Sequence, residues 1–522
     1  MPKVSGGGGG GGSRRVQAGV GGAAGPAGVT GCPSAESVRG ARHLAKTMPH
    51  EEQSSAWSSA GAEHRGQVIG SWARARLSRC RRRILYPLAV TINRDDCRAR
   101  DAEDRLAPLR PLFEVEALDA QGLIYLDGNS LGLLPRATAA RVQEVIQGEW
   151  GHGLIRSWNT AGWITFSHRV GDKIAPLIGA GPGEVLVADS TSVNLYKALS
   201  AAIALVKADS PRRNRIVAEQ ADFPSDLYMA DTLAREQGFE LALVEADHIC
   251  AAMDDRTAVL LLTHVNYRTG RMHPMDDLTR AAHAAGALVI WDLSHSVGAL
   301  PVDLKGGGAK EAAADFAVGC GYKYLNGGPG APAFIWAHPS LTARMDREQR
   351  RQPLSGWLGH AAPFEFTSDY RPAPGIARFM CGTPPILSLT ALDCGVGVFG
   401  AADAVGGVNA LREKSIALTD LFIDLVEARC AGYGLTLVTP REPALRGSQV
   451  SFAHESAGYP IMQALIAREV IGDFRAPDIL RFGFTPLYAR FVDVWDAVHR
   501  LEVVLREESW REPRWSVRAA VT

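Results

Sequence analysis

The feature that most constrains the fold is an alternation of short apolar strands and helices between Glu184 and Asp292. The strands are EVLVA, RIVAE, AVLLLT and ALVIWD, and patterns typical of helices, such as SVNLYKALSAAIAL and MDDLTRAAHAAG, lie between them. This order predicts βαβ units and a parallel sheet. AVLLLT is apolar at almost every position, which indicates a strand covered on both faces. The fold class predicted for this region is therefore α/β.

The stretch from Ala287 to Gly330 places chemically active groups at the ends of two strands. Asp292 closes the strand ALVIWD, and His295 follows on the turn. The strand DFAVG runs into Lys323 and then into a glycine-rich loop. In open α/β sheets the ligand crevice lies at the carboxyl ends of the strands. We therefore expect a carboxylate, an imidazole and an amine at one crevice.

These three groups match the needs of pyridoxal phosphate. A lysine holds that cofactor as a Schiff base, and a buried carboxylate pairs with its pyridine nitrogen. The simpler alternatives are a solvated surface lysine and an aspartate that only forms a turn. The combination of Asp292, His295 and Lys323 in one stretch favours the cofactor site.

Two further segments could bind an anion or serve only as helix caps. Asp189 to Ser192 lie where a strand passes into a helix, and the N–H groups of a helix start bind phosphate well. The loop FPSD, residues 223–226, likewise precedes a helix that Asp226 can cap. Neither segment carries a GxGxxG or GxxxxGK[ST] motif, so neither a dinucleotide nor a nucleoside triphosphate is indicated.

Two other segments carry residues suited to a substrate. GHGLIRSWNTAGW reads as a loop, and its tryptophans could anchor the core or form a wall for an aromatic molecule. Arg481 lies between apolar residues in DILRFGFTPLY, so it needs an acidic partner. That partner is either a protein carboxylate or the α-carboxylate of a substrate.

Several motifs, in order along the chain, resemble one known family: YLDGNSLGLLP, LIRSWN, WDLSHSVGALPVDL, GYKYLNGGPG and RFGFTPLY. The resemblance is to kynureninase, a pyridoxal-phosphate enzyme with the aspartate aminotransferase fold, and it runs from about Ile92 to about Leu505. It implies fold type I of the class V kind, with a mostly parallel seven-stranded sheet and a small C-terminal α+β domain. The expected divisions are a Gly/Arg-rich tail (1–91), an N-terminal segment against the small domain and active site (92–160), a large cofactor-binding domain (161–385), a small domain (386–508) and a polar tail (509–522).

The resemblance also implies roles for individual residues. The catalytic residues are Lys323, Tyr322 and Asp292. The cofactor contacts are Thr191, Ser192, Phe223, Pro224, Ser225, Asp226, Thr263, Asp292, His295, Tyr322, Lys323, Trp357 and Thr383. The substrate contacts are Arg481, His152 and Trp158. Some family members carry asparagine at the position of Thr383, so the contact of Thr383 with the cofactor is expected to differ from the contact made by that asparagine. The contacts of Trp357 and Thr383 are expected from a neighbouring subunit, which implies a homodimer.

The implied reaction is hydrolysis of L-kynurenine, and of L-3-hydroxykynurenine, to anthranilate or 3-hydroxyanthranilate and L-alanine. The resemblance therefore implies that the protein is a hydrolase that acts in tryptophan catabolism, in the kynurenine pathway and in NAD biosynthesis. One alternative is a cysteine desulfurase or selenocysteine lyase, which would need a reactive cysteine on a mobile loop. Cys320 instead lies in the strand before Lys323, a poor place for one. A second alternative, a catalytically silent scaffold, conflicts with the intact set of Asp292, His295 and Lys323.

Composition adds few constraints. The 56 basic and 56 acidic residues balance, so no nucleic-acid partner is expected. The eight cysteines are scattered without zinc-site spacing, which indicates no metal, free thiols and a cytoplasmic location. We expect no apolar run long enough to span a membrane. Residues 1–91 combine a glycine run with an arginine-rich patch at 74–83, which predicts a disordered tail without a catalytic role, a targeting peptide, or a true start near Met48 or later.

Overall fold

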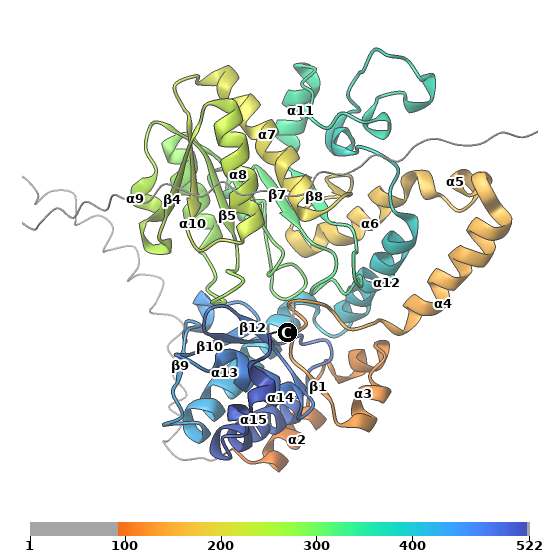
Figure 1. Ribbon diagram of the computed structural model, residues 1–522. Coiled ribbons are helices and arrows are strands. Elements are labelled where there is room, and N and C mark those ends of the chain that lie inside the picture. The colour runs from red at the N-terminus through yellow and green to blue at the C-terminus, as the bar shows by residue number, and fades with distance from the viewer. Residues whose placement is uncertain (1–91, 519–522) are drawn as a thin grey trace, which may run out of the picture. The chain divides into compact units, whose positions relative to one another are not determined.

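Seven strands form the central sheet of the computed structural model, which describes residues 92–518 (Figure 1). Predictions for residues 1–91 lie outside the described residues. The strands are β2 (Val185–Val187), β3 (Arg215–Glu219), β4 (Glu240–Val244), β5 (Thr257–Thr263), β6 (Leu288–Asp292), β7 (Phe316–Gly319) and β8 (Phe334–Ala337). Their order is β2-β8-β7-β6-β5-β3-β4. Only β8 runs antiparallel to its neighbours in this sheet, so the predicted mostly parallel, seven-stranded α/β sheet is confirmed.

Both faces of this sheet are buried, which explains the continuous apolar runs. Successive side chains of a strand point to opposite faces. In β5, Leu260 and Leu262 join one core cluster, whereas Val259 and Leu261 join another. The first cluster includes residues of α6 (Phe166–Ile174), α10 (Met275–Ala285) and α12 (Ile386–Asp403); the second includes residues of α7 (Thr191–Asp209) and α8 (Pro224–Gln237).

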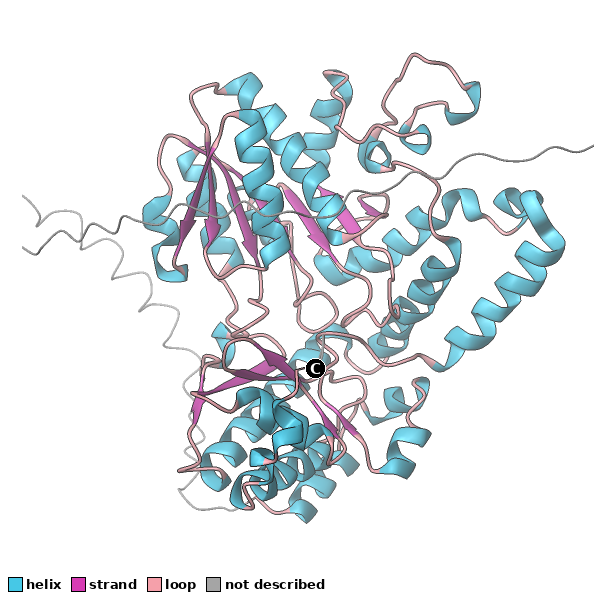
Figure 2. Ribbon diagram, in the orientation of Figure 1, coloured by secondary structure: helices cyan, strands magenta, loops and turns pink. Residues whose placement is uncertain are grey.

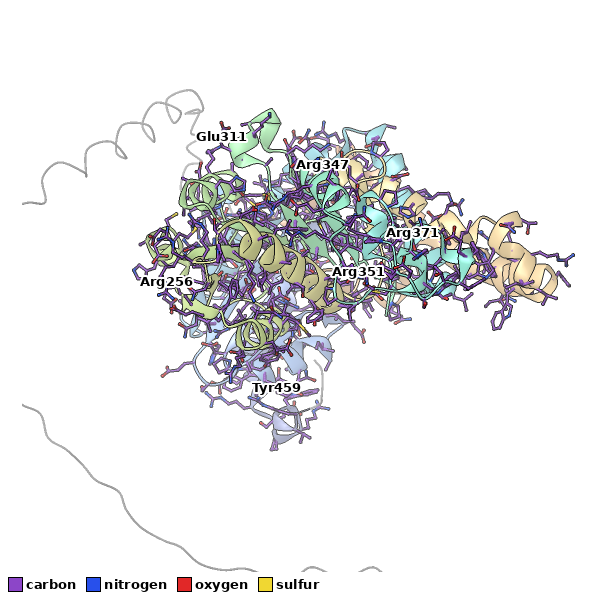
Figure 3. All side chains as sticks on the ribbon, turned by 90° about the horizontal axis from the view of Figure 1, so that it is seen from above. Arg256, Glu311, Arg347, Arg351, Arg371 and Tyr459 are labelled. Carbon is purple, nitrogen blue, oxygen red and sulfur yellow. The ribbon has the colours of Figure 1, made fainter. Side chains whose placement is uncertain are left out.

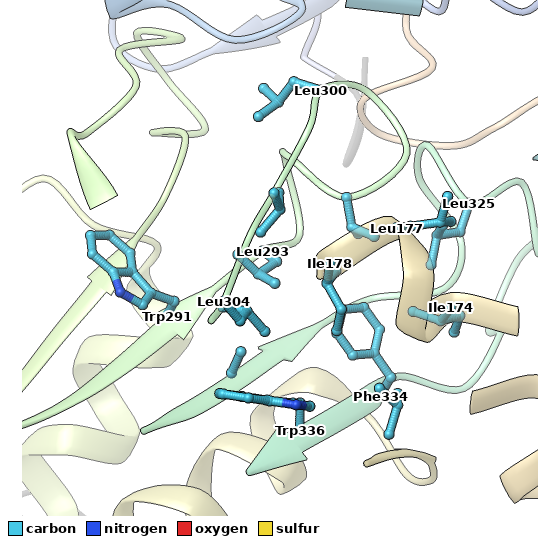
Figure 4. Close-up of a cluster of buried hydrophobic side chains, with 14 of the residues drawn as sticks. Ile174, Leu177, Ile178, Trp291, Leu293, Leu300, Leu304, Leu325, Phe334 and Trp336 are labelled. Atoms are coloured by element: carbon cyan, nitrogen blue, oxygen red, sulfur yellow. The ribbon is translucent and has the colours of Figure 1, made fainter. Parts of the chain in front are cut away.

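Large side chains fill the core beside the strand ends (Figure 4). Trp291 of β6 and Trp336 of β8 are fully buried in the same cluster as Phe334 and Leu293. The indole N–H of Trp291 donates to Thr279 of α10 at 3.1 Å, so its polar atom is satisfied. A core packed in this way fixes the strand ends on which the site is built.

Helix α12 corrects one prediction. Among residues 92–518 it is long and apolar enough to span a membrane by length and composition, with a mean hydropathy of 1.4. The expectation that no run reaches this length is therefore wrong. Leu389, Leu392, Val396 and Phe399 pack in the core of the large sheet, which accounts for the apolar composition. The domain boundary placed at residue 385 stays a prediction, although α12 packs with the core on its N-terminal side.

The C-terminal part contains a second, antiparallel sheet (Figure 2). Its strands, in the order β12-β13-β10-β9, are β12 (Asp473–Arg475), β13 (Ile479–Gly483), β10 (Gln449–His454) and β9 (Leu435–Leu437). The helices here are α13 (Gly407–Arg429), α14 (Gly458–Ile466) and α15 (Phe491–Arg506). Phe422 of α13 packs against Phe452 and Phe482 of the sheet. This is the small α+β domain expected from the sequence.

The N-terminal segment is joined to this small domain. It contains α2 (Arg94–Ala102), α3 (Glu116–Gln121), β1 (Ile124–Tyr125) and α4 (Arg136–Glu144). β1 pairs in parallel with β11 (Val470–Ile471). Asn93 caps α2, and Arg94 forms an ion pair with Asp496 of α15 at 2.6 Å. The start of the described chain is thus held by residues about 350–400 positions away.

Two stretches are more ordered than the sequence suggested. After α4 the chain continues as a π-helix, Val145–Gly153, and then as 3₁₀ turns and the short α5 (Ser157–Thr160), so the predicted loop is wrong. Glu149 explains this, because its carbonyl accepts from Ser157 Oγ and its carboxylate from Trp163 Nε1, both at 2.6 Å. In the predicted polar tail, Trp510 and Trp515 pack against the small-domain core.

The segment around α11 (Pro339–Arg347) is rich in arginine, and Arg347, Arg351 and Arg371 are visible there from above (Figure 3). Arg371 pairs with Glu365 at 2.7 Å. Arg351 lies over the ring of Tyr370, 5.5 Å from its centroid. Much of the positive charge in this segment is therefore engaged within the chain.

One helix, α9 (Ile249–Ala252), completes the set of described α-helices.

Candidate active site

A cavity of about 390 Å³ opens at the carboxyl ends of β5, β6 and β7, beside the start of α7. Its volume is typical of small-molecule sites. The structure brings eleven of the predicted residues to its wall: Thr191, Ser192, Phe223, Ser225, Asp226, Thr263, Asp292, His295, Tyr322, Lys323 and Thr383. They come from six separate segments. The parallel sheet gathers them because all its strand ends on this side meet at one edge.

Lys323 and His295 are in direct contact. Lys323 Nζ lies 2.8 Å from His295 Nε2. Burial, together with the positive charge of Lys323, holds the pKa of His295 well below its ordinary value, so the ring is neutral and accepts a hydrogen bond from the amine. Lys323 Nζ also lies 5.8 Å from the ring centroids of Phe223 and of Tyr322. The amine is thus held by a neutral partner between two aromatic rings.

Asp292 forms an acidic pair with Asp226. Both side chains are almost fully buried, and each affects the pKa of the other. Burial raises the pKa of both groups, and the charge of Asp292 raises that of Asp226 further. Ser294 donates to Asp292 from its N–H at 2.8 Å and from its hydroxyl at 2.6 Å, which favours the ionised form of Asp292. The proton of this pair therefore belongs on Asp226, and the charge on Asp292.

The start of α7 forms another wall and suits an anion. Ser190 is the N-cap, and its hydroxyl accepts from Val193 N–H at 3.4 Å. The remaining first N–H groups of a helix have no partner within the helix. Thr191 Oγ1 is buried and has no hydrogen-bond partner among residues 92–518. These groups can hold a phosphate, and the capping role of Ser190 coexists with that function.

The loop before α8 carries Phe223 into the cavity. Asp222 fixes this loop, because its carboxylate accepts from Phe223 N–H at 3.1 Å and from Thr263 N–H at 3.0 Å. Phe223 meets Tyr267 edge to face, with ring centroids 5.1 Å apart. Pro224 does not line the cavity; it occupies the first turn of α8, where proline is well tolerated.

Arg481 stands behind the cavity wall. It is 1% exposed, forms an ion pair with Asp473 and donates to Ser130 Oγ at 2.5 Å. Its Nη1 donates to the carbonyl of Tyr267, which itself lines the cavity, at 2.8 Å. The structure therefore shows the protein-acid partner for Arg481. Its contact with a substrate carboxylate stays a prediction.

Three other predicted residues lie away from the cavity of the chain. His152 is exposed, and Trp158 packs against Trp163 with centroids 6.1 Å apart. Trp357 is 39% exposed and contacts Phe364 at 5.9 Å. Thr383, which was expected to act from a neighbouring subunit, lies on the wall of its own chain's cavity.

Sequence reasoning missed Tyr267, Ser294 and Asp222. Tyr267 lines the cavity beside Phe223, and its signal was an aromatic residue just beyond the predicted strand AVLLLT. Ser294 follows Asp292 by two residues, a spacing at which a carboxylate often accepts from the backbone. Asp222 precedes the predicted loop by one residue. Burial and nearby carboxylates raise its pKa to about 7.

Cys320 does not behave as a reactive thiol. It lines the inner end of the cavity but is 2% exposed, and burial raises its pKa. Its Sγ lies 3.9 Å from the carbonyl of Ser294. A reactive cysteine needs an exposed site that favours the thiolate. Cys320 therefore does not meet the requirement of a desulfurase.

Solved structures first define the class of this fold. A cysteine desulfurase from Thermococcus onnurineus has a TM-score of 0.62 at 18% identity, covering 77% of this chain and 98% of that one. A cysteine desulfurase from Escherichia coli has a TM-score of 0.61 at 18% identity, with the same coverage. At this identity the likeness shows the fold alone, which is that of the class V aminotransferase-like enzymes, as predicted.

Sequence relatives then give the family. A family model described as the kynureninase C-terminal domain matches residues 411–501. A kynureninase from Burkholderia pseudomallei is 55% identical over 435 residues, covering 82% of this chain and 99% of the relative. One from Pseudomonas fluorescens is 54% identical over 432 residues, with the same coverage. The chain belongs to the kynureninase family, and the resemblance found in its motifs is confirmed.

Proposed function

We propose that this protein is a pyridoxal-phosphate-dependent kynureninase that hydrolyses L-kynurenine to anthranilate and L-alanine. The observation that carries the proposal is the gathering of Lys323, Asp292, His295 and Thr191 at one cavity in a chain of this family. L-3-Hydroxykynurenine is expected to react as well, with 3-hydroxyanthranilate as product.

The residues present fit the cofactor. Thr191 Oγ1 is a buried hydroxyl without a hydrogen-bond partner among the described residues, at a helix start that attracts anions, so it suits the phosphate. Asp292 is a buried carboxylate that suits a protonated pyridine nitrogen, and Phe223 offers a ring to stack on the pyridine. Lys323 would hold the aldehyde carbon. When bound, the cofactor supplies an electron sink for charge that develops on the carbon bearing the substrate amine.

Three groups of this chain then manage protons. The amine of Lys323, freed by the substrate, removes the proton from the substrate Cα and later returns one. Neutral His295 accepts a hydrogen bond from that amine and keeps it in place. Burial raises the pKa of Tyr322, so its phenol stays protonated and can donate to a phosphate or to a reacting atom.

The overall reaction balances with one water. The water oxygen adds to the γ-carbonyl carbon, and the Cβ–Cγ bond breaks. The γ-carbon leaves as the carboxyl group of anthranilate, and Cβ takes up a proton to become the methyl group of alanine. Arg481 would bind the α-carboxylate. The contacts of His152 and Trp158 with the aromatic ring stay predictions, because both residues lie away from the cavity of this chain.

Incubation of purified protein with pyridoxal phosphate and L-kynurenine tests this proposal, with anthranilate fluorescence as the readout. Wild-type protein should produce anthranilate, and Lys323→Ala should not. A wild-type protein that binds the cofactor but forms no anthranilate would overturn the substrate assignment.

We also infer a homodimer in which Trp357 contacts the phosphate of the neighbouring subunit. Trp357 does not reach the cavity of its own chain. Large apolar side chains are exposed at Ile155, Phe364 and Phe366, by 77%, 63% and 80%. Phe364 contacts both Trp357 and Phe366, so these three rings are contiguous, and a contiguous exposed apolar patch marks an interaction surface.

Subunit mixing tests the role of Trp357. Lys323→Ala and Trp357→Ala subunits, each weakly active alone, should regain activity when mixed as dimers. One site of the mixed dimer then has both the lysine and the neighbouring tryptophan. A mixture no more active than its parts would contradict the contact across subunits. The cytoplasmic location and the roles in tryptophan catabolism and NAD biosynthesis remain predictions.

A further inference from the structure

We propose that Lys197 is a positioning residue for the cofactor phosphate. It neutralises Asp189 at the rim of the cavity and fixes the start of α7 against the segment 379–383. The inference rests on the proposed function, because it assumes that the cavity binds pyridoxal phosphate.

Lys197 is an unusual lysine because its side chain is 0% exposed. A buried ammonium is strongly unfavourable unless other groups replace its hydration. Lys197 Nζ donates to Asp189 Oδ2 and to the carbonyl of Phe379, both at 2.7 Å. Neither bond is with its own turn of α7, so this lysine links three segments of the chain.

Asp189 lies where a phosphate would bind. It joins β2 to α7, lines the cavity and directly precedes the N-cap Ser190. Its φ of 49° is uncommon for a residue other than glycine and turns the chain into the helix. The carboxylate is 31% exposed. Without a counter-charge, a carboxylate here would repel an anion at the helix start.

The bond to Phe379 acts on the opposite wall. Met380, Gly382 and Thr383 follow this residue and line the cavity. In the same segment, burial raises the pKa of the Cys381 thiol, and the charge of Asp189 raises it further. Lys197 therefore holds two walls of the cavity together from behind, at the end where Thr191 lies.

A merely structural ion pair would behave differently from a phosphate-positioning pair. Loss of structure would weaken binding of pyridoxal phosphate and of pyridoxal alike. Loss of phosphate positioning would weaken only the phosphorylated form. The ratio of the two affinities therefore separates the roles.

The test compares Lys197→Met with Lys207→Met, an exposed lysine on the same helix whose Nζ donates to Gln237 at 3.0 Å. Dissociation constants for pyridoxal phosphate and pyridoxal are measured by equilibrium dialysis. Lys197→Met should bind pyridoxal phosphate at least ~10-fold more weakly, with less than a ~2-fold change for pyridoxal. Lys207→Met should match the wild type. Equal losses for both ligands, or none, would overturn the inference.

Two variants keep the inference testable if Lys197→Met folds poorly. Asp189→Asn/Lys197→Met removes both charges and should regain most of the lost affinity for pyridoxal phosphate. Asp189→Asn alone should bind it at least as tightly as the wild type, because it removes a negative charge. Weaker binding by Asp189→Asn would overturn the role of Lys197 in neutralising that charge. A wild type that prefers neither ligand would instead overturn the proposed cofactor.

Discussion

The cavity wall at the large sheet and the cluster around Arg481 in the small sheet differ in the partners of their charged side chains. At the cavity, Lys323 contacts the neutral ring of His295, and Thr191 Oγ1 has no hydrogen-bond partner in the part of the chain that the structure describes. In the cluster, the guanidinium of Arg481 is already bound to Asp473 and Ser130. The first region presents its polar groups to a cavity, whereas in the second the arginine already has a protein carboxylate as its counter-charge.

The difference follows from how the two sheets are built. Parallel strands end at one edge, and the crevice there keeps polar groups partly accessible. Arg481, in the middle of the antiparallel strand β13, is buried and needs a protein partner to offset its lost hydration. To bind a substrate carboxylate, Arg481 must therefore either contact it in addition to Asp473 or break its ion pair with Asp473. Five variants test this contrast.

The largest effect is expected at Lys323. Lys323→Ala removes the amine that would hold the cofactor and move the Cα proton, so kcat should fall by ~10³-fold or more. Anthranilate formation measures this, with the exposed Lys310→Ala as control. Activity within ~10-fold of the wild type would exclude Lys323 as the central base.

Arg481→Gln should raise the KM for L-kynurenine by ~10²-fold with a smaller change in kcat, because a charge-assisted contact with the carboxylate is lost. It should also lower the free energy of unfolding by roughly 2–4 kcal/mol, because Asp473 loses one of its cations. Steady-state kinetics and urea unfolding measure the two effects. A lower stability with an unchanged KM would mean that Arg481 stabilises the fold and does not bind the substrate.

Each region also holds a carboxyl group whose pKa burial raises to about 7: Asp222 behind the cavity and Asp127 near Arg481. The native state binds these protons more tightly than the unfolded chain, so each group loses stabilising free energy as the pH rises from about 4 to 7. Between about pH 5.5 and 7 the loss is at most ~2 kcal/mol per group.

Asp222→Asn and Asp127→Asn should each make urea unfolding less dependent on pH in this range. The exposed Asp255→Asn serves as the control. A pH dependence identical to that of the wild type in either variant would show that the carboxyl group does not titrate there. Comparing the two variants shows whether the buried carboxyl groups of both regions titrate in this pH range or only one of them does.

The smallest effect is expected at Phe223. Phe223→Leu removes the edge-to-face contact with Tyr267 and the ring that would stack on the cofactor. Affinity for pyridoxal phosphate should fall by ~3–10-fold, because such ring contacts contribute about 0.5–1.5 kcal/mol. Tyr228→Leu, exposed on α8, controls for loss of an aromatic ring. Unchanged affinity would leave Phe223 with a packing role only.

The sequence by itself determined the order of elements and the residues at the strand ends. Strand and helix periods differ, and a parallel sheet must place Asp292, His295 and Lys323 at one edge, so local patterns were sufficient. The family motifs identified the same residues. The helical stretch that follows α4, residues 145–160, was missed because Glu149 stabilises it through hydrogen bonds with residues eight and fourteen positions away.

Tertiary structure alone decided which charges meet. The pairs Asp226–Asp292 and Arg481–Asp473 join different elements, and their partners cannot be assigned from spacing. Lys197 looked like one more polar position of an ordinary helix until folding buried it against Asp189. The physical reason is that burial sets the cost of a charge, and burial is a property of the packed chain rather than of any local segment.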